Sequence, residues 1–274
     1  MENKVDYHFH SYYSDGTMKP TELVKKYKEE KYDIIALTDH DGIDGIAEAM
    51  IAGEALEIQV VTGIELSTDF FAPGYSEAID VHILGYQFDV ENEKLIEKCK
   101  EIMAERRVRN EKLLKVIKEL GYELQYEDLI ERKGQKYIGK PNFARALVRK
   151  GYIDHYSEAF EPGKLLESPE AKAVKKVKMT IEEAMELIKQ AGGIPVLAHP
   201  MEWADQPMFK GISKEEFFER LDVLIRHLKK SGLKGVECYH PSAADEDSME
   251  LFKIAQKYHL HVTRGSDFHG DLTK

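Results

Sequence analysis

Apolar residues recur along the chain in two patterns, which predict strands and helices in alternation. Short, nearly unbroken apolar runs indicate buried strands, and we expect these at residues 4–9, 33–37, 58–64, 81–86, 194–198, 235–239 and 260–263. Apolar residues at helical spacing indicate amphipathic helices, which we expect at residues 20–30, 43–57, 180–190, 213–230 and 243–258. Two helix starts have the form of a capping box, Thr180 with Glu183 and Ser213 with Glu216.

The alternation stops in the middle of the chain. From 91 to 120 a long charged segment carries apolar residues at helical spacing, with no strand after it. Shorter helical pieces follow at 126–132 and 141–149, among loops rich in Gly, Pro and Glu. We therefore predict an α/β fold, a distorted TIM-like barrel of seven βα units built from residues 1–90 and 180–274. Residues 91–179 would form an inserted helical lid, and the strands would follow a right-handed βα series.

Nine potential metal ligands lie mostly at or just after these apolar runs. In a barrel of parallel strands the C-terminal strand ends converge on one face, where such folds carry their chemistry. An isolated pair of histidines such as His8 and His10 is more often structural than metal-binding. Here, however, potential ligands lie at or just beyond the end of an apolar run at five places. The nine candidates are His8, His10, Asp15, His40, Glu65, His82, His199, Asp267 and His269.

The chemistry of this set restricts the metal. It contains only imidazole and carboxylate groups, which suits Mn, Fe or Zn and differs from a structural zinc site made of thiolates. Nine ligands are too many for one ion and natural for two to three divalent ions, with a carboxylate such as Glu65 bridging. The two cysteines, Cys99 and Cys238, offer neither a disulfide framework nor a thiolate cluster.

Composition and charge limit the partners. The chain has 274 residues, no apolar stretch of membrane length and no basic-apolar leader, so we expect a cytoplasmic protein without membrane contact. A net charge of −11 argues against binding to long duplex nucleic acid. Residues 132–178, however, carry 12 Lys or Arg against 5 Asp or Glu, a local charge of +7. This segment is either an ordinary solvated surface or an attractor for a small anionic phosphate ester.

Several motifs together resemble the polymerase and histidinol phosphatase (PHP) family. They are the Asp-x-His-x-His-Ser start at Asp6, Ser14-Asp15-Gly16, Leu37-Thr38-Asp39-His40-Asp41, Gly63-Ile64-Glu65, Ala198-His199-Pro200 and Gly265-Ser266-Asp267-Phe268-His269-Gly270. The insertion, with its run from Gly139 to Leu147, resembles the branch of nucleoside bisphosphate phosphatases, some of which also trim short RNA from the 5′ end. Asn142 stands where that pattern has a histidine, and the family usually carries one more strand beyond the position of Lys274.

The resemblance implies a ligand set, a nucleophile and an activity. One ion would be held by His8, His10, Glu65 and Asp267, a second by Glu65, His82 and His199, and a third by Asp15, His40 and His269. A bridging hydroxide would attack the phosphorus. The expected activity is hydrolysis of a nucleoside 3′,5′-bisphosphate to the 5′-monophosphate, with short oligoribonucleotides as further substrates. Alternatives are a histidinol-phosphate phosphatase and a metal-bound PHP module without catalytic activity.

Other residues have candidate roles outside the ligand set. In the insertion, Lys140, Arg145 and Arg149 are candidates for holding the second phosphate, with Arg106 and Arg109 as the next pair. Each is otherwise an ordinary surface charge of a helix. His240 is a substrate contact, the acid that protonates the leaving group, or a surface histidine. Asp39 and Asp41 flank His40 and would orient its ring, although for Asp41 we prefer a role as cap of the following helix.

Overall fold

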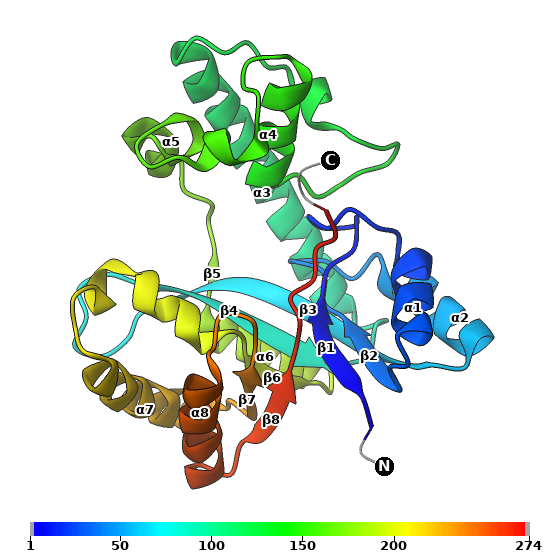
Figure 1. Cartoon of the computed structure of the whole chain (residues 1–274), viewed down its shortest axis with the longest axis vertical. Coiled ribbons are helices and arrows are strands. Elements are labelled where there is room, and N and C mark those ends of the chain that lie inside the picture. The colour runs from blue at the N-terminus through cyan, green and yellow to red at the C-terminus, as the bar shows by residue number, and fades with distance from the viewer. Residues whose placement is uncertain (1–2, 272–274) are drawn as a thin grey trace.

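The protein is described by a computed structural model that covers residues 3–271, in which one sheet of eight strands organises the fold (Figure 1). Its order is β1-β2-β3-β4-β6-β7-β8, with the short β5 beside β3. The strands are β1 Val5–Phe9, β2 Ile34–Leu37, β3 Gln59–Phe70, β4 Ile79–Tyr86, β5 Met179–Thr180, β6 Ile194–Leu197, β7 Gly235–Tyr239 and β8 His261–Arg264. The seven expected strands are therefore present, and β5 is an addition.

Helices cover the outside of the sheet, close to where the apolar spacing predicts them. They are α1 Pro20–Glu29, α2 Ile46–Leu56, α6 Ile181–Gln190, α7 Lys214–Ser231 and α8 Asp245–Lys257. The capping box at Thr180 is confirmed, because its hydroxyl accepts from the backbone of Glu183 and the Glu183 carboxylate accepts from the backbone of Thr180. At Ser213 the hydroxyl accepts from the backbone N–H of Glu216, which is one half of the expected box.

The expected series of parallel strands is wrong at β4. This strand is antiparallel to both β3 and β6. The eight residues between β3 and β4 are too few for the helical crossover that parallel neighbours need, so the two strands form a hairpin. Both strands are also longer than expected, because β3 continues six residues beyond Ile64. As a result, His82, near the start of β4, lies opposite Ser67 at the far end of β3.

The sheet curls into a nearly closed barrel. The segment that follows β8 pairs with β1: the backbone of His10 donates to Phe268 O at 2.9 Å, and that of Asp267 donates to His8 O at 2.8 Å. This pairing brings the last described residues of the chain beside the first strand. The fold is thus a distorted α/β barrel, as the sequence predicts.

Two apolar cores lie beneath the helices of the barrel. The larger one packs α6, α7 and α8 against the sheet around residues such as Ile64, Leu197 and Ile225. The smaller one packs α1 and α2 around Phe9 and Leu37. These cores fix the strands whose ends carry the candidate ligands.

Residues between β4 and β5 form a helical insertion that projects above the barrel (Figure 1). It contains α3 Glu93–Glu119, α4 Lys140–Arg149, α5 Pro169–Ala173 and the 3₁₀ turns Tyr126–Leu129, Tyr156–Phe160 and Leu165–Glu167. The first half of α3 packs on the barrel core through Leu95, Cys99 and Ile102, whereas Leu113 and Ile117 belong to a separate core inside the insertion. No helix within residues 3–271 has the length and apolar character needed to cross a membrane.

Candidate metal centre

The nine candidate ligands meet at one end of the barrel, although they come from almost the whole length of the chain. His8 is on β1, Glu65 on β3 and His82 on β4, and the others follow β1, β2, β6 and β8. Because β4 runs antiparallel to β3 and β6, the beginning of β4 lies at the edge where these two neighbours end. The hairpin thereby places His82 at the same edge as the residues that follow the parallel strands.

Glu65 lies at the centre of the cluster and is 1% exposed. Its Oε2 is 3.3 Å from His8 Nε2, 3.2 Å from His10 Nε2 and 2.9 Å from His40 Nδ1. Its Oε1 is 2.8 Å from His82 Nδ1 and 3.0 Å from His199 Nε2. One carboxylate thus faces five imidazoles, the arrangement expected of a bridging ligand.

Two aspartates complete the cluster on either side. Asp267 Oδ1 is 3.3 Å from His8 Nε2 and 3.1 Å from His10 Nε2. Asp15 lies 3.3 Å from His269 and 3.6 Å from His40. Potential ligand atoms lie within 4.8 Å of one another in the sets His8-His10-Glu65-Asp267, His10-Asp15-His40-His269 and His40-Glu65-His82.

The donor atoms fit divalent transition metals. Glu65 Oε2, Asp15 Oδ1 and His40 Nδ1 are buried and have no hydrogen-bond partner among the described residues, although nitrogen and oxygen atoms converge on them. Burial opposes ionisation of Glu65 and Asp15, yet His40 and the other imidazoles hold the pKa of both carboxyl groups well below the usual range. Anionic carboxylates and imidazoles in such convergence form an N/O ligand set.

The nine residues are held in place by others, of which sequence reasoning missed Glu237 and Glu202. Glu237, fully buried on β7, lies 3.0 Å from His8 Nδ1 and accepts from the backbone of His199. Glu202 lies 3.1 Å from His199 Nδ1. A carboxylate inside the apolar strand run of β7 was a usable signal for Glu237, because a buried charge needs a partner. A Cβ at Gly265 would collide with His8 and Glu237, so this position requires glycine.

The aspartates that flank His40 have roles other than those expected. Asp39 accepts from the backbone of Ser11 at 2.7 Å and from the hydroxyls of Ser11 and Ser14, and so fixes the loop after β1. Asp41 does not cap the following helix, whose N-cap is Gly45. Its carboxylate instead accepts from the Ser67 backbone and pairs with Arg106 and Lys176.

His240 reaches the edge of the cluster from the end of β7. Its Nδ1 accepts from the backbone N–H of Ser242 at 3.1 Å, so in the neutral ring the proton is on Nε2. That Nε2 lies 3.5 Å from Asp267 Oδ2 and has no hydrogen-bond partner among the described residues. The side chain is 4% exposed, so the alternative of a surface histidine is wrong, and a buried N–H faces the metal centre.

The basic residues of α4 are already paired inside the insertion. Arg145 donates to both carboxylate oxygens of Glu131 at 2.7 and 2.9 Å, and Arg149 contacts the same carboxylate at 3.3 Å. Lys140 donates to Glu167 at 2.9 Å. Asn142 also donates to Glu131. Most donors expected for the substrate's second phosphate therefore bind acidic groups of the insertion itself.

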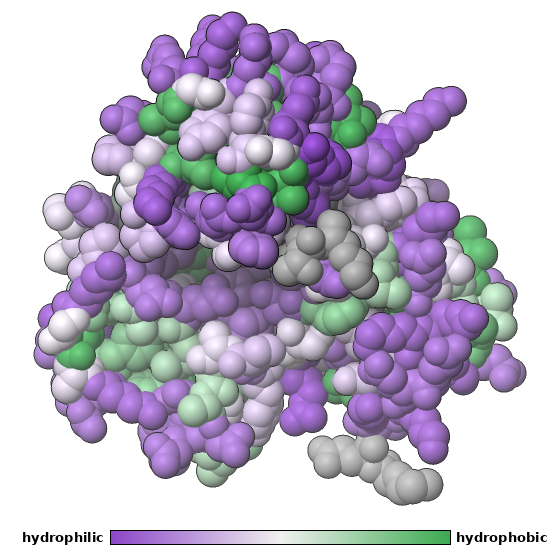
Figure 2. Space-filling model, turned by 45° about the horizontal axis from the view of Figure 1, so that its top comes forward, coloured by the Kyte–Doolittle hydropathy of each residue, from purple (hydrophilic) through white to green (hydrophobic). Residues whose placement is uncertain are grey.

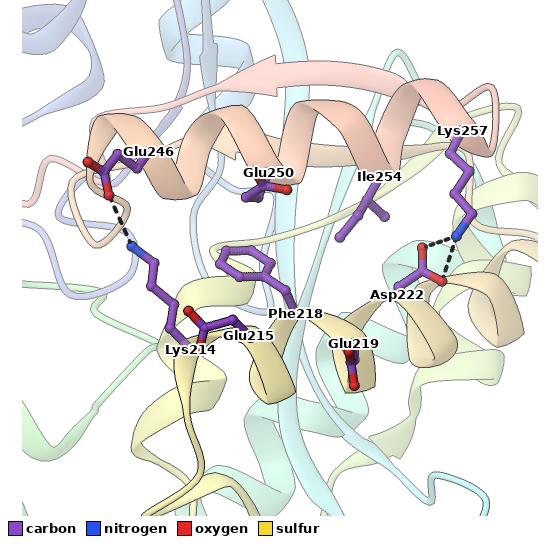
Figure 3. A pocket seen from close by; sticks show the side chains of 9 residues that line it. All are labelled: Lys214, Glu215, Phe218, Glu219, Asp222, Glu246, Glu250, Ile254 and Lys257. Carbon is purple, nitrogen blue, oxygen red and sulfur yellow. Dashed lines mark hydrogen bonds and ion pairs between the residues drawn. The ribbon is translucent and has the colours of Figure 1, made fainter.

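A separate groove of about 660 Å³ lies between α7 and α8. Lys214 and Lys257 stand at its two ends, each paired with an acidic residue, while Phe218 and Ile254 lie between them (Figure 3). None of its lining residues belongs to the cluster. The groove is thus separate from the ligand cluster, and Figure 2 shows hydrophilic side chains between the barrel and the insertion.

A barrel with this cluster at one end defines the class of metal-dependent hydrolases. The chain belongs to the PHP domain family, whose model matches residues 6–194, and it is a metal-dependent phosphoesterase. The motifs that resemble this family in the sequence are the same residues that the fold gathers around Glu65.

Relatives of known name are similar over nearly the whole chain. A 5′-3′ exoribonuclease of Haemophilus influenzae is 30% identical, over 98% of this chain and 91% of its own. A 3′,5′-nucleoside bisphosphate phosphatase of Chromobacterium violaceum is 28% identical, over 97% and 87%. A solved structure of a proposed metal-dependent phosphoesterase from Bifidobacterium adolescentis is 27% identical, over 100% of this chain and 90% of its own, with a TM-score of 0.82.

Proposed function

We propose that this enzyme hydrolyses nucleoside 3′,5′-bisphosphates to nucleoside 5′-monophosphates and phosphate, and that it also removes nucleotides from the 5′ end of short RNA. The observation that carries the proposal is the ligand cluster around Glu65, which lies directly below a basic insertion. The names of the relatives, a bisphosphate phosphatase and an exoribonuclease, support the same substrate class.

The cluster would hold about two to three divalent ions, with Mn, Fe or Zn suited to its N/O donors. His8, His10, Glu65 and Asp267 would hold one ion. Glu65, His82 and His199 would hold another, and Asp15, His40 and His269 a third. When bound, such ions polarise the phosphoryl group and activate water as the nucleophile.

The chain's own residues would supply the remaining steps. His240 would donate a hydrogen bond from Nε2–H to the ester oxygen. As an imidazolium, with Nδ1–H donating to Ser242 Oγ, it would pass the Nε2 proton to the leaving oxygen as the P–O bond breaks and become neutral. Glu237 keeps the His8 ring oriented through Nδ1, so that Nε2 of His8 faces the cluster. The partly exposed sides of His82, Asp267 and His269 leave the cluster accessible to substrate.

A substrate panel tests the proposal. Protein purified without chelators is analysed for Mn, Fe and Zn, and phosphate release is measured with adenosine 3′,5′-bisphosphate, adenosine 5′-monophosphate and histidinol phosphate. We expect about two to three equivalents of metal. The specificity constant for the bisphosphate should be about ten- to a hundredfold higher than for either monophosphate, because a charge-assisted contact holds the second phosphate.

His10→Ala should lose both metal and activity, because His10 contributes to two of the ligand sets. His155→Ala is the matched control, since His155 is an exposed histidine of the insertion. A higher specificity constant for histidinol phosphate than for the bisphosphate would contradict the proposed substrate and support the alternative, a histidinol-phosphate phosphatase. Full activity of metal-free protein would overturn the metal centre itself.

A further inference from the structure

Arg109 is a buried cation without a counter-ion. The described part of the chain has three buried arginines, Arg106, Arg109 and Arg145. Arg106 pairs with Asp41, and Arg145 pairs with Glu131. Arg109 is 8% exposed, yet within residues 3–271 its side chain has no hydrogen bond and no acidic partner, and its Nε is buried without an acceptor.

The surroundings of Arg109 raise the free-energy cost of burying its unpaired positive charge. Burial and, to a lesser extent, the charge of neighbouring Arg106 lower the pKa of Arg109 to about 10, and only Tyr137 acts in the opposite direction. Arg106 and Arg109 are three residues apart on α3 and therefore share a helix face. They occupy the stripe that is apolar elsewhere on this helix, at Leu95, Ile102 and Leu113. Arg106 is compensated by Asp41, but the unpaired, desolvated charge of Arg109 beside it does not stabilise the fold.

Tyr137 connects this pair to the metal centre. Its ring stacks on His40, with 6.2 Å between the ring centroids. The guanidinium carbon of Arg106 lies 3.9 Å from the centroid of the same ring. Burial raises the pKa of Tyr137, Arg106 and Arg109 act to lower it, and Asp15 acts to raise it. Tyr137 therefore contacts both Arg106 and the ligand cluster, and Arg109 lies one helical turn from Arg106 on α3.

We propose that Arg109, supported by Arg106, binds the phosphate group of the substrate that is not hydrolysed. This inference rests on the proposed function for the identity of the ligand. A guanidinium offers paired donors that match phosphate oxygens, and a ligand phosphate supplies the negative charge that the chain itself does not provide at Arg109. The same contact serves the 5′-phosphate of a mononucleotide or that of a short RNA. It assigns to α3 the role that sequence reasoning gave first to Lys140 and Arg145.

The test compares Arg109→Met with Arg107→Met. Arg107 is on the same helix, but its side chain is 66% exposed and pairs with Glu111. With adenosine 3′,5′-bisphosphate, we expect Arg109→Met to lower kcat/KM about ten- to a hundredfold. With p-nitrophenyl phosphate, which has no second phosphate, it should remain within about twofold of the wild type. Arg107→Met should resemble the wild type on both substrates.

A 5′-phosphorylated tetraribonucleotide distinguishes the two sources of the phosphate. A loss on both this substrate and the bisphosphate indicates one shared phosphate site, whereas a loss on only one of them assigns the site to that substrate. Equal losses on the bisphosphate and on p-nitrophenyl phosphate would mean that Arg109 serves the reacting group or the fold. No loss on either nucleotide substrate would also overturn the inference.

Ligand binding provides a readout that does not depend on turnover. Adenosine 5′-monophosphate should raise the Tm of the purified wild-type protein more than adenosine does, because binding to the folded state stabilises it. Arg109→Met should lose this difference, and Arg107→Met should keep it. If no phosphoester is hydrolysed but the difference still depends on Arg109, the proposed function fails and the phosphate site stands. If Arg109→Met keeps the difference, the phosphate site fails whatever the activity.

Discussion

At the scale of single residues, the metal centre depends on carboxylates that bind no metal in the proposed scheme. Glu237 is the clearest case, because it contacts the ring of His8 and also accepts from the backbone of His199. Both of its oxygens are thereby used to fix two ligands that come from different strands. Partners of this kind set the orientation and basicity of a coordinating imidazole.

Glu237→Gln should therefore weaken metal binding without removing a ligand. We expect the affinity for Mn to fall about ten- to a hundredfold. It is measured by titrating Mn into protein from which a chelator has removed the metal. The reason is that an amide gives His8 and the His199 backbone a neutral partner in place of a charged one. The control is Glu219→Gln on α7, which lies in the groove far from the ligand set. An unchanged affinity in Glu237→Gln would contradict the orienting role.

At the scale of elements, acidic residues as well as an apolar core hold the insertion together. Glu131 binds Arg145, Arg149 and Asn142, which all belong to α4. The carboxylate therefore anchors α4 to the loop before it. The basic residues of segment 132–178 were expected from the sequence to attract the substrate. Some of them instead pair with acidic residues of the insertion.

Glu131→Gln should destabilise the insertion. Arg145, whose side chain is 8% exposed, would lose its charged partner, and we expect a loss of about 1–3 kcal/mol in the free energy of unfolding. Urea denaturation followed by circular dichroism provides the measurement. Glu111→Gln, which removes the exposed partner of Arg107, should change the same quantity by at most about 0.5 kcal/mol. Similar values for the two variants would refute the anchoring role.

At the scale of the whole molecule, Asp41 ties the barrel to both ends of the insertion. It follows β2 in the barrel, and it pairs with Arg106 on α3 and with Lys176 just before β5. The pKa of Lys176 is lowered to about 8, chiefly because burial outweighs the opposite effect of Asp41. The aspartate is fully buried and has a left-handed backbone conformation with φ of 55°. These contacts place the insertion above the metal centre.

Asp41→Asn should consequently destabilise the whole protein. It would leave two buried cations without their charged partner, for which about 3–5 kcal/mol is typical. We expect a clear fall in Tm by calorimetry. Asp44→Asn is the matched control, because within residues 3–271 Asp44 pairs only with Lys136, at a site where both side chains are largely exposed. Equal Tm values for Asp41→Asn and the wild type would show that the network does not hold the insertion in place.

The sequence by itself determined the element types, the barrel and the identity of the cluster. The spacing of apolar residues within one segment follows from the secondary structure of that segment. It therefore predicts strands and helices even when the segments that pack against them are not known. Ligand types at strand ends were equally visible, and the fold brings all nine residues together around Glu65.

Only the tertiary structure decided the strand directions and the partners of the charges. The antiparallel β4 follows from a hairpin whose pairing joins strands 3 and 4 across a short loop, which apolar runs alone do not reveal. Contacts between separate segments decide that Arg145 pairs with Glu131 and that Asp41 pairs with Arg106. They also leave Arg109 without an acidic partner among residues 3–271. A charge in a sequence has no fixed role, because its energy depends on what the fold brings within a few ångströms of it.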